Sequence, residues 1–327
     1  MGSNSITWLE KLEEQLNVDV DSMDPTFAKS LPFKPHNQTS NQLLVNEQMS
    51  IPENKELFLK ASVLLCAKNI DNIQVRVLLQ TSPFHAYDTD KVVEHARAYA
   101  REFESVGISK DRFCIKIPCT GPTMNAGPIL LKDGIRTLGT SLFEVRAHAE
   151  LSLWPDVKDP ATQHTMSARM VQILETYKRL YMETGKDQPM VKSASFISPK
   201  EAMAAGEMGC HHATISSDVL TQLSKLDYDG SKQPGEGVPK PMHAYKNAGP
   251  TPARLSKLAK TDPLAAANWD GKLASTDIDY LANNGAELEK AIEADPVTKT
   301  RLFEAFDLFK GGELRSKAAI EEALRQL

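Results

Sequence analysis

A lysine stands in the middle of an otherwise apolar stretch, Phe113–Pro118, which reads FCIKIP. The alternation of a β-strand puts the phenylalanine and both isoleucines on one face and Lys116 on the other, and the proline marks the end of the strand. Burying an ammonium group is costly unless it is paired or loses its proton. Lys116 is therefore predicted to be the functional centre of a site. The alternative is a structural lysine paired with a carboxylate.

Gln80 is a second polar side chain at the end of an apolar strand, since it closes the run at 74–79. In a parallel barrel the carboxyl ends of the strands meet at the mouth, so Lys116 and Gln80 are predicted to point into the same mouth. An amide cannot act as a base, but it can orient a water molecule by hydrogen bonds. The alternative is that Gln80 is a lining residue with its hydrogen bonds satisfied.

The elements that must position these residues alternate between strand and helix along the chain. Besides the strand that carries Lys116, the apolar spacing predicts strands at 17–21, 42–45, 74–79, 135–139, 151–153, 190–195 and 212–216. It predicts helices at 56–68, 90–106, 124–131, 142–149, 159–184, 199–206 and 218–226. Helices between strands imply a parallel sheet of the α/β class. About eight strands, with no glycine-rich phosphate loop after any of them, favour a single closed (β/α)8 TIM barrel.

The part of the chain after the barrel has a different composition. Residues 228–252 are rich in Gly, Pro, Lys and Ser and predict a loop. Two amphipathic stretches, at 277–294 and 297–327, predict extra C-terminal helices whose apolar stripes pack on the barrel; a role in binding a partner is the alternative. The predicted organisation is a barrel body at 1–226, a linker at 227–252 and a C-terminal helical segment at 253–327.

The composition excludes several classes of function. The 327 residues carry a net charge of −5, which gives no electrostatic footprint for nucleic acid or an anionic membrane. No apolar run is long enough to span a membrane, and the first residues hold no signal core. Four cysteines at irregular spacing predict reduced, mostly buried thiols in a cytoplasmic protein. The pair His211 and His212 has no second cluster at metal-ligand spacing, so neither a metal nor another cofactor is expected.

Several short stretches in a fixed order resemble the transaldolases, and they extend over about residues 18–226. The stretch Gly107–Thr120 resembles the strand on which these enzymes carry their imine-forming lysine. Four more stretches resemble transaldolase motifs, namely Lys34–Asn41 (KPHNQTSN), Ala86–Asp90 (AYDTD), Ala194–Phe196 (ASF) and Gly209–Ile215 (GCHHATI). The resemblance implies a TIM barrel and an enzyme that makes or breaks C–C bonds by aldol chemistry.

The resemblance also implies roles for single residues. Lys116 corresponds to the imine-forming lysine, Asp21 to the acid/base aspartate and Thr140 to a threonine that assists a catalytic water. For Asp21, the nearby Asp24 is the alternative correspondence. The implied substrate-binding residues are Asn41, Ser152, Trp154 and Ser195.

Four departures from the family pattern bear on the substrate. Gln80 stands where the transaldolases have a glutamate that activates the water, as in related fructose-6-phosphate aldolases. Leu138 replaces an asparagine. Val157 and Ile197 stand where two arginines bind phosphate, a contact that aliphatic side chains cannot make. Lys158 and Lys192 lie nearby in sequence as candidate substitutes for the lost positive charge.

The resulting hypothesis is a transaldolase-like enzyme that uses Lys116 on a small carbonyl substrate without a phosphate group. A conventional transaldolase of the pentose phosphate pathway, or a catalytically silent relative that binds a metabolite or a partner, are the alternatives. The substrate is the expected partner, with neither nucleic acid nor membrane involved. The oligomeric state stays open, a homodimer included.

Overall fold

The computed structural model describes residues 6–49, 51, 61–140, 156–230, 240, 243–246, 248–265, 267, 269, 271–272 and 275–325. The chain divides into two compact units, each made of two separate segments. Unit 1 consists of residues 1–19 and 146–274, and unit 2 of residues 20–145 and 275–327. Strand β1 (Asn17–Asp21) runs across the dividing point, so each unit holds a part of it.

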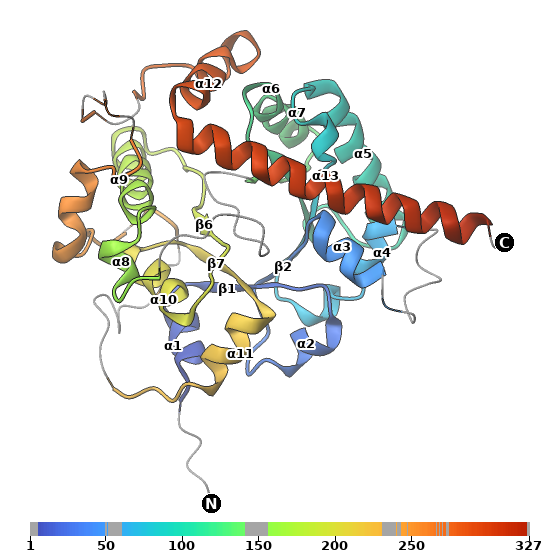
Figure 1. Ribbon diagram of the computed structural model, residues 1–327, viewed down its shortest axis with the longest axis horizontal. Coiled ribbons are helices and arrows are strands. Elements are labelled where there is room, and N and C mark those ends of the chain that lie inside the picture. Colours follow the sequence, from blue (N-terminus) through green and yellow to red (C-terminus); the bar gives the residue numbers. More distant parts are fainter. Residues whose placement is uncertain are drawn as a thin grey trace, which may run out of the picture. The chain divides into compact units, whose positions relative to one another are not determined.

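Unit 2 holds four further strands and most of the described helices (Figure 1). The strands are β2 (Asn37–Thr39), β3 (Arg76–Gln80), β4 (Phe113–Pro118) and β5 (Thr137–Thr140). The helices and 3-10 turns between them are α2 (Pro25–Ser30), α3 (Gln42–Met49), α4 (Ala61–Ala67), η2 (Ile70–Asn72), η3 (Pro83–His85), α5 (Thr89–Ser105), α6 (Gly121–Met124) and α7 (Ala126–Lys132). The second segment of this unit adds α12 (Ala282–Ala294) and α13 (Pro296–Arg325).

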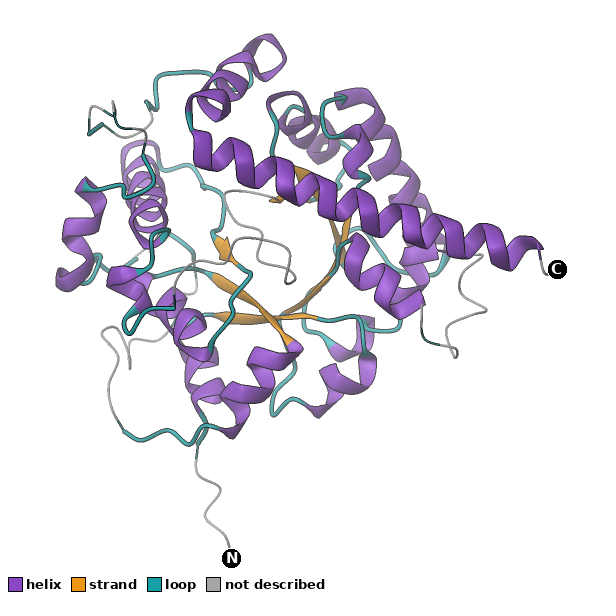
Figure 2. Cartoon of the chain, in the orientation of Figure 1, coloured by secondary structure: helices purple, strands orange, loops and turns teal. Residues whose placement is uncertain are grey.

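Unit 1 repeats the alternation of helix and strand on a smaller scale (Figure 2). Besides its part of β1, it holds the strands β6 (Lys192–Ser193) and β7 (His212–Ser216). Its helices are α1 (Trp8–Gln15), α8 (Pro160–Gln163), α9 (Ser167–Thr184), α10 (Pro199–Met208), α11 (Ser217–Lys225) and the 3-10 helix η4 (Ala253–Lys260).

The strands are parallel wherever their register is resolved. In unit 2 they follow the order β5-β4-β3-β2-β1, and in unit 1 strand β1 neighbours β7, which pairs with β6. Seven parallel strands alternating with helices confirm the predicted α/β class. The strand predicted at 151–153 lies outside the described residues, so closure into an eight-stranded barrel stays a prediction.

The core of unit 2 explains why β4 takes its place in the sheet. Phe113, Ile115 and Ile117 are fully buried on one face of the strand, as the alternation predicts. The ring of Phe113 stacks on Phe103 of α5, with ring centroids 4.6 Å apart. This apolar face anchors the strand on the helix and leaves the opposite face, with Lys116, for polar contacts.

One predicted strand is wrong, and one predicted helix is interrupted. Residues 42–45 belong to α3, because the side-chain oxygen of Asn41 accepts hydrogen bonds from the backbone N–H groups of Leu43 and Leu44 and caps a helix there. The strand of this region is β2, a few residues upstream. The helix predicted at 159–184 is two helices, α8 and α9, because the chain turns after the cap of α8 at His164.

The second segment of unit 2 contacts the connection that follows β4. Helix α12 packs on α6, and the carboxylate of Glu289 accepts a hydrogen bond from the backbone N–H of Gly121. Gly285 takes a left-handed conformation, with φ +79°, and a Cβ atom on it would lie 2.2 Å from backbone atoms of Gly121. This close contact requires a glycine on each side, and it holds the start of α6.

Candidate active site

Lys116 lies on β4, two residues before the end of the strand, and is partly buried. Its Nζ donates a hydrogen bond to the backbone oxygen of Ser40 over 3.0 Å. The register pairs Lys116 with Gln80 of β3 on one side and with Leu138 of β5 on the other. The amine therefore stands beside the amide that the sequence places near it.

Gln80 is buried, with 2% of its surface exposed. Both its amide nitrogen and its amide oxygen lack a hydrogen-bond partner among the described residues. A buried polar group without a partner costs about 1–3 kcal/mol, so native proteins rarely keep one unless it has a further role. The Gln80 amide can donate one hydrogen bond and accept another next to the Lys116 amine.

The carboxylates of Asp21 and Asp24 have different hydrogen-bond partners. Asp21 is the last residue of β1, and its Oδ1 accepts a hydrogen bond from the hydroxyl group of Thr39 at the end of β2. Asp24 caps α2, where its Oδ1 accepts a hydrogen bond from the backbone N–H of Thr26 over 2.8 Å. The cap gives Asp24 a structural task, and Asp21 stays the predicted acid/base residue.

The predicted residues of unit 2 gather where parallel strands end. Asp21, Gln80 and Thr140 are the last residues of β1, β3 and β5, and Lys116 lies near the end of β4. The register places Thr140 opposite Pro118, and its backbone oxygen accepts a hydrogen bond from Cys119. In sheets of this class, catalytic groups come from the carboxyl ends of several strands. An amine, a carboxylate, an amide and a hydroxyl at one sheet edge form a set suited to imine and proton-transfer chemistry.

The predicted substrate-binding residues have different surroundings. Asn41, in unit 2, has its side-chain oxygen engaged in the cap of α3. Ser195, in unit 1, follows β6 and takes a left-handed conformation with φ +65°, a strained backbone often found at functional sites. Ser152 and Trp154 lie outside the described residues.

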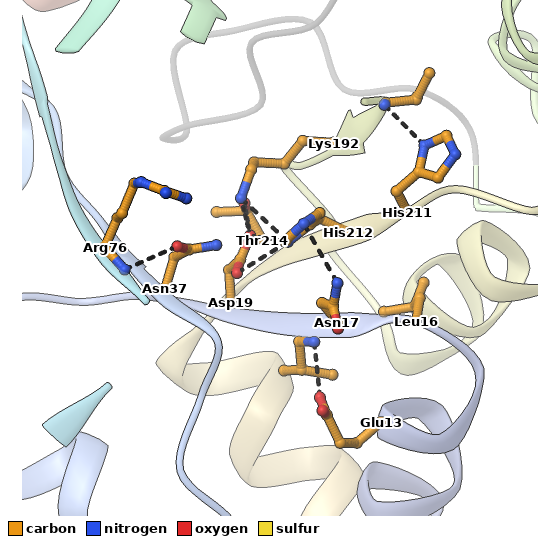
Figure 3. Close-up of polar contacts among 12 residues, drawn as sticks. Glu13, Leu16, Asn17, Asp19, Asn37, Arg76, Lys192, His211, His212 and Thr214 are labelled. Carbon is orange, nitrogen blue, oxygen red and sulfur yellow. Dashed lines mark hydrogen bonds and ion pairs between the residues drawn. The ribbon is translucent and has the colours of Figure 1, made fainter. Parts of the chain in front are cut away.

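A cluster that the sequence did not predict lies in unit 1 (Figure 3). Asp19 of β1, Lys192 of β6 and His212 of β7 are in mutual contact. Nδ1 of His212 lies 3.2 and 3.1 Å from the two oxygens of Asp19, and Nζ of Lys192 donates a hydrogen bond to one of them. Two features of the sequence relate to this cluster, namely Asp19 between two valines and Lys192 in a short strand. Neither feature predicts that the two side chains are in contact.

Lys192 therefore does not fill the place of a lost phosphate-binding arginine as an unpaired cation, because its charge is already balanced by Asp19. Of the two positions that have lost an arginine, Val157 is partly buried and Ile197 is 39% exposed. Neither side chain carries a charge.

The cysteines and histidines form no metal centre in the part of the chain that the structure describes. The four thiols are buried and unbridged, and burial raises the pKa of Cys66, Cys119 and Cys210 to about 12. The ring of His211 accepts a hydrogen bond at Nδ1 from the backbone N–H of Val191. Among the described residues, no helix is both long and apolar enough to cross a membrane.

Comparison with known proteins shows which family the chain belongs to. The family model described as Transaldolase/Fructose-6-phosphate aldolase matches residues 36–250. The transaldolase of Methylobacillus flagellatus is 26% identical over 255 residues, which cover 67% of this chain and 79% of that protein. Those of Actinobacillus pleuropneumoniae serotype 3 and Histophilus somni are 24% and 26% identical over 300 and 305 residues, which in both cases cover 77% of this chain and 93% of the relative.

The matched span includes Gln80, Lys116 and Thr140, and it begins after Asp21. It covers about two thirds of the chain and includes every described strand except β1. The chain belongs to the transaldolase/fructose-6-phosphate aldolase family and is an enzyme of the aldolase type.

Proposed function

We propose that Lys116 forms an imine with a small ketone or aldehyde that carries no phosphate group, and that the enzyme makes or breaks a C–C bond next to this imine. The observation that carries the proposal is the pairing of Lys116 with Gln80. A lysine amine stands in register with a buried amide whose donor and acceptor both lack a partner among the described residues. Such a pair, at the ends of parallel strands, is suited to hold a carbonyl compound and a water molecule.

The reaction begins with addition of the neutral Lys116 amine to the substrate carbonyl, followed by uptake of one proton from solvent and loss of one water molecule to give an iminium ion. Asp21 then takes the proton of the hydroxyl group on the β-carbon. The electrons of the α–β C–C bond move into the iminium group, an aldehyde leaves, and an enamine stays on the lysine. Addition of a second aldehyde to the enamine, or its protonation, followed by return of the water, frees Lys116. Gln80 orients the water in both directions.

The absence of a phosphate requirement rests on two positions. Val157 and Ile197 stand where the resemblance places phosphate-binding arginines, and neither can donate a hydrogen bond from its side chain. The second candidate function is that of a conventional transaldolase, which moves a dihydroxyacetone unit between sugar phosphates. It is supported by the relatives, which are named transaldolases and whose alignment with this chain covers 93% of their length.

Reductive trapping tests the imine directly. Borohydride added with dihydroxyacetone is expected to leave one stable adduct, mapped by mass spectrometry to the peptide that contains Lys116. Lys116→Met, which keeps a similar volume and removes the amine, is expected to abolish the adduct without unfolding the protein. Lys132→Met, at an exposed position of α7, is the matched control and is expected to label normally. Labelling of another lysine, or full activity of Lys116→Met, would contradict the proposal.

A further inference from the structure

Strand β3 of unit 2 extends beyond the part of it that pairs with β2. The last pair in the register of the two strands is Thr39 with Leu78, because the chain then leaves the sheet and begins α3 at Gln42. Gln80 and Thr81 lie past this point and are both buried. Buried backbone oxygens need hydrogen-bond donors, so another group must take the place of β2 there.

Side chains of the turn between β2 and α3 supply these donors. The hydroxyl group of Ser40 donates a hydrogen bond to the backbone oxygen of Leu78 over 2.6 Å. Nε2 of Gln42 donates one to the backbone oxygen of Thr81 over 2.9 Å and lies 3.5 Å from that of Gln80. Gln42 is buried at the first position of α3, with 8% of its surface exposed. Its amide therefore continues the hydrogen bonding of β2 along β3.

The peptide group that joins Gln80 to Thr81 is also held from the side of β4. The backbone N–H of Thr81 donates a hydrogen bond to the backbone oxygen of Lys116 over 2.9 Å, and its hydroxyl group donates one to the same oxygen over 3.2 Å. Thr81 is thus fixed between Gln42 and the strand that carries the lysine. Because the side-chain amide of Gln80 has no partner among the described residues, its direction depends on the backbone that carries it.

Helix α13 packs on α3 and contacts Gln42 (Figure 1). Gly312 lies so close that a Cβ atom on it would be 3.0 Å from the backbone carbonyl group of Gln42. The next residue of α13, Glu313, accepts a hydrogen bond from the hydroxyl group of Ser82 over 2.7 Å. Two consecutive residues of α13 therefore contact the donor, Gln42, and the segment that follows its acceptor.

We infer that Gln42 is a positioning residue for the reaction, because it holds the backbone of Gln80 and Thr81 in the place that puts the Gln80 amide beside Lys116. Helix α13 holds Gln42 in turn through Gly312. The inference rests on the proposed function, because it concerns the water-orienting role of Gln80 in the same site. A neutral amide suits this task, because it donates a hydrogen bond without adding a charge to the segment that contacts the Lys116 amine through Ser40.

A double-mutant cycle tests whether Gln42 acts through Gln80. Gln42→Met keeps a similar volume and removes the donor. It is expected to slow borohydride trapping of dihydroxyacetone on Lys116 by about three- to tenfold, the effect of losing one hydrogen bond. In Gln80→Met protein, which has already lost the water-orienting amide, the same change is expected to cause no further loss. Gln48→Met, near the other end of α3 and equally buried, is the matched control and is expected to leave trapping unchanged in both proteins.

Two neighbouring glycines of α13 test the same contact without a change in α3. Gly312→Ala places a methyl group against the backbone of Gln42, whereas a methyl group at Gly311 meets only the flexible end of Arg315. Both changes suit α13 itself, because alanine favours a helix over glycine. Gly312→Ala is expected to slow trapping in protein that has Gln80 but not in Gln80→Met protein, and Gly311→Ala to leave it unchanged. If Gln42→Met does not fold, this pair decides the inference in its place, and equal trapping by the two glycine variants overturns it.

A second measurement does not depend on imine formation. The heteronuclear NOE of the Gln80 side-chain ¹⁵N signal, assigned by its absence in Gln80→Met protein, reports how firmly the amide is held. Gln42→Met is expected to lower this NOE, and Gln48→Met to leave it unchanged. An unchanged NOE in Gln42→Met, or an equal loss of trapping with and without the Gln80 amide, would overturn the inference and leave the proposed function standing. Absence of any adduct on Lys116 would defeat the proposed function, and the NOE would then decide whether Gln42 positions Gln80.

Discussion

Gln80 offers the most direct change of chemistry at a single residue. Gln80→Glu places a carboxylate beside Lys116, and a carboxylate titrates whereas an amide does not. Imine exchange on Lys116 is therefore expected to become more dependent on pH in the acidic range. The measurement is the rate of adduct formation with dihydroxyacetone between pH 4 and pH 8 in both proteins. Identical pH profiles would show that Gln80 does not contact the reacting water.

The two positions without arginines give a test of substrate class. The unaltered enzyme is expected to use fructose 6-phosphate poorly, because Val157 and Ile197 cannot bind its phosphate group. Val157→Arg/Ile197→Arg is expected to lower the KM for fructose 6-phosphate by tenfold or more, since each bidentate arginine adds a charge-assisted contact of about 1.5–3 kcal/mol. The corresponding values for fructose serve as the control. Efficient, saturable use of sugar phosphates by the unaltered enzyme would favour a conventional transaldolase.

Among the elements, the contact between α12 and α6 allows a test with a matched pair of glycines. Gly285 and Gly107 both have φ near +80°, but only Gly285 has backbone atoms where a Cβ would lie. Gly285→Ala adds a steric clash to the backbone strain, whereas Gly107→Ala adds only the strain. Gly285→Ala is expected to lower the free energy of unfolding by roughly 1–3 kcal/mol more than Gly107→Ala. Urea unfolding of the two variants measures the difference. Equal losses in the free energy of unfolding would mean that α12 shifts and relieves the steric clash.

The end of β3 is tied to two helices through Ser82. Its backbone N–H donates a hydrogen bond to Nδ1 of His95 on α5, and its hydroxyl group donates one to Glu313 on α13. Burial, together with the nearby charge of His85, lowers the pKa of His95 to about 4. The folded state therefore holds His95 neutral, with Nδ1 ready to accept.

The lowered pKa of His95 determines how the stability of the protein changes with pH. Between about pH 6.5 and pH 4 the unfolded chain binds a proton at His95 that the folded chain does not, so stability falls as the pH is lowered through this range. His95→Gln removes the titrating group and is expected to flatten the decline, by an amount on the order of 1–3 kcal/mol. Glu313, whose pKa is raised by burial, acts in the opposite direction and is unchanged in both proteins. Thermal unfolding at several pH values provides the measurement, and parallel curves would exclude His95 as the cause.

The elements also show where reasoning from sequence succeeds. Strong local patterns define the strand His212–Ser216 and the helices that became α5 and α11, and the structure confirms them within a residue or so at each end. The run at 42–45 is a helix and not the predicted strand, because one capping side chain, that of Asn41, outweighs the strand propensity of Leu and Val. Caps are single hydrogen bonds that a search for periodicity does not detect.

The polar residues of the two units differ in how far the sequence predicts their contacts. The neighbourhood of Lys116 and Gln80 follows from a simple rule, because consecutive parallel strands end at one edge. The contacts of Asp19 do not, since they join residues 173 and 193 positions apart in sequence. Finding them requires the knowledge that β1 lies beside β7, a pairing between the first strand of the chain and its last described one.

For the molecule as a whole, the Asp19 cluster predicts how stability responds to charge. Asp19→Asn leaves an ammonium group buried without its carboxylate and is expected to cost about 3–5 kcal/mol at pH 7. Asp19→Asn/Lys192→Met removes both charges and is expected to recover most of that loss. Chemical denaturation followed by circular dichroism measures both variants. Failure of the double variant to recover stability would show that the cluster stabilises the fold by more than charge balance.

The contribution of the Asp19 carboxyl group to stability depends on pH. Its pKa is lowered in the folded state, so its contribution to stability is complete above the unfolded value of about 3.9 and is lost as the pH falls below it. The stability gap between the unaltered protein and Asp19→Asn is therefore expected to narrow below about pH 4.

The division of unit 2 into two distant segments has a consequence for biosynthesis. The strands around Lys116 come from residues 20–145, but the helices α12 and α13 of the same unit come from residues 275–327, after the whole of 146–274. A ribosome must therefore make all of unit 1 before unit 2 receives its last helices. Until then α3 and the start of α6 expose the surfaces that α13 and α12 later cover. Unit 2, which carries Lys116, therefore completes its fold later than unit 1 on the nascent chain. Until α12 and α13 are made, its exposed apolar surfaces are a site for chaperone binding.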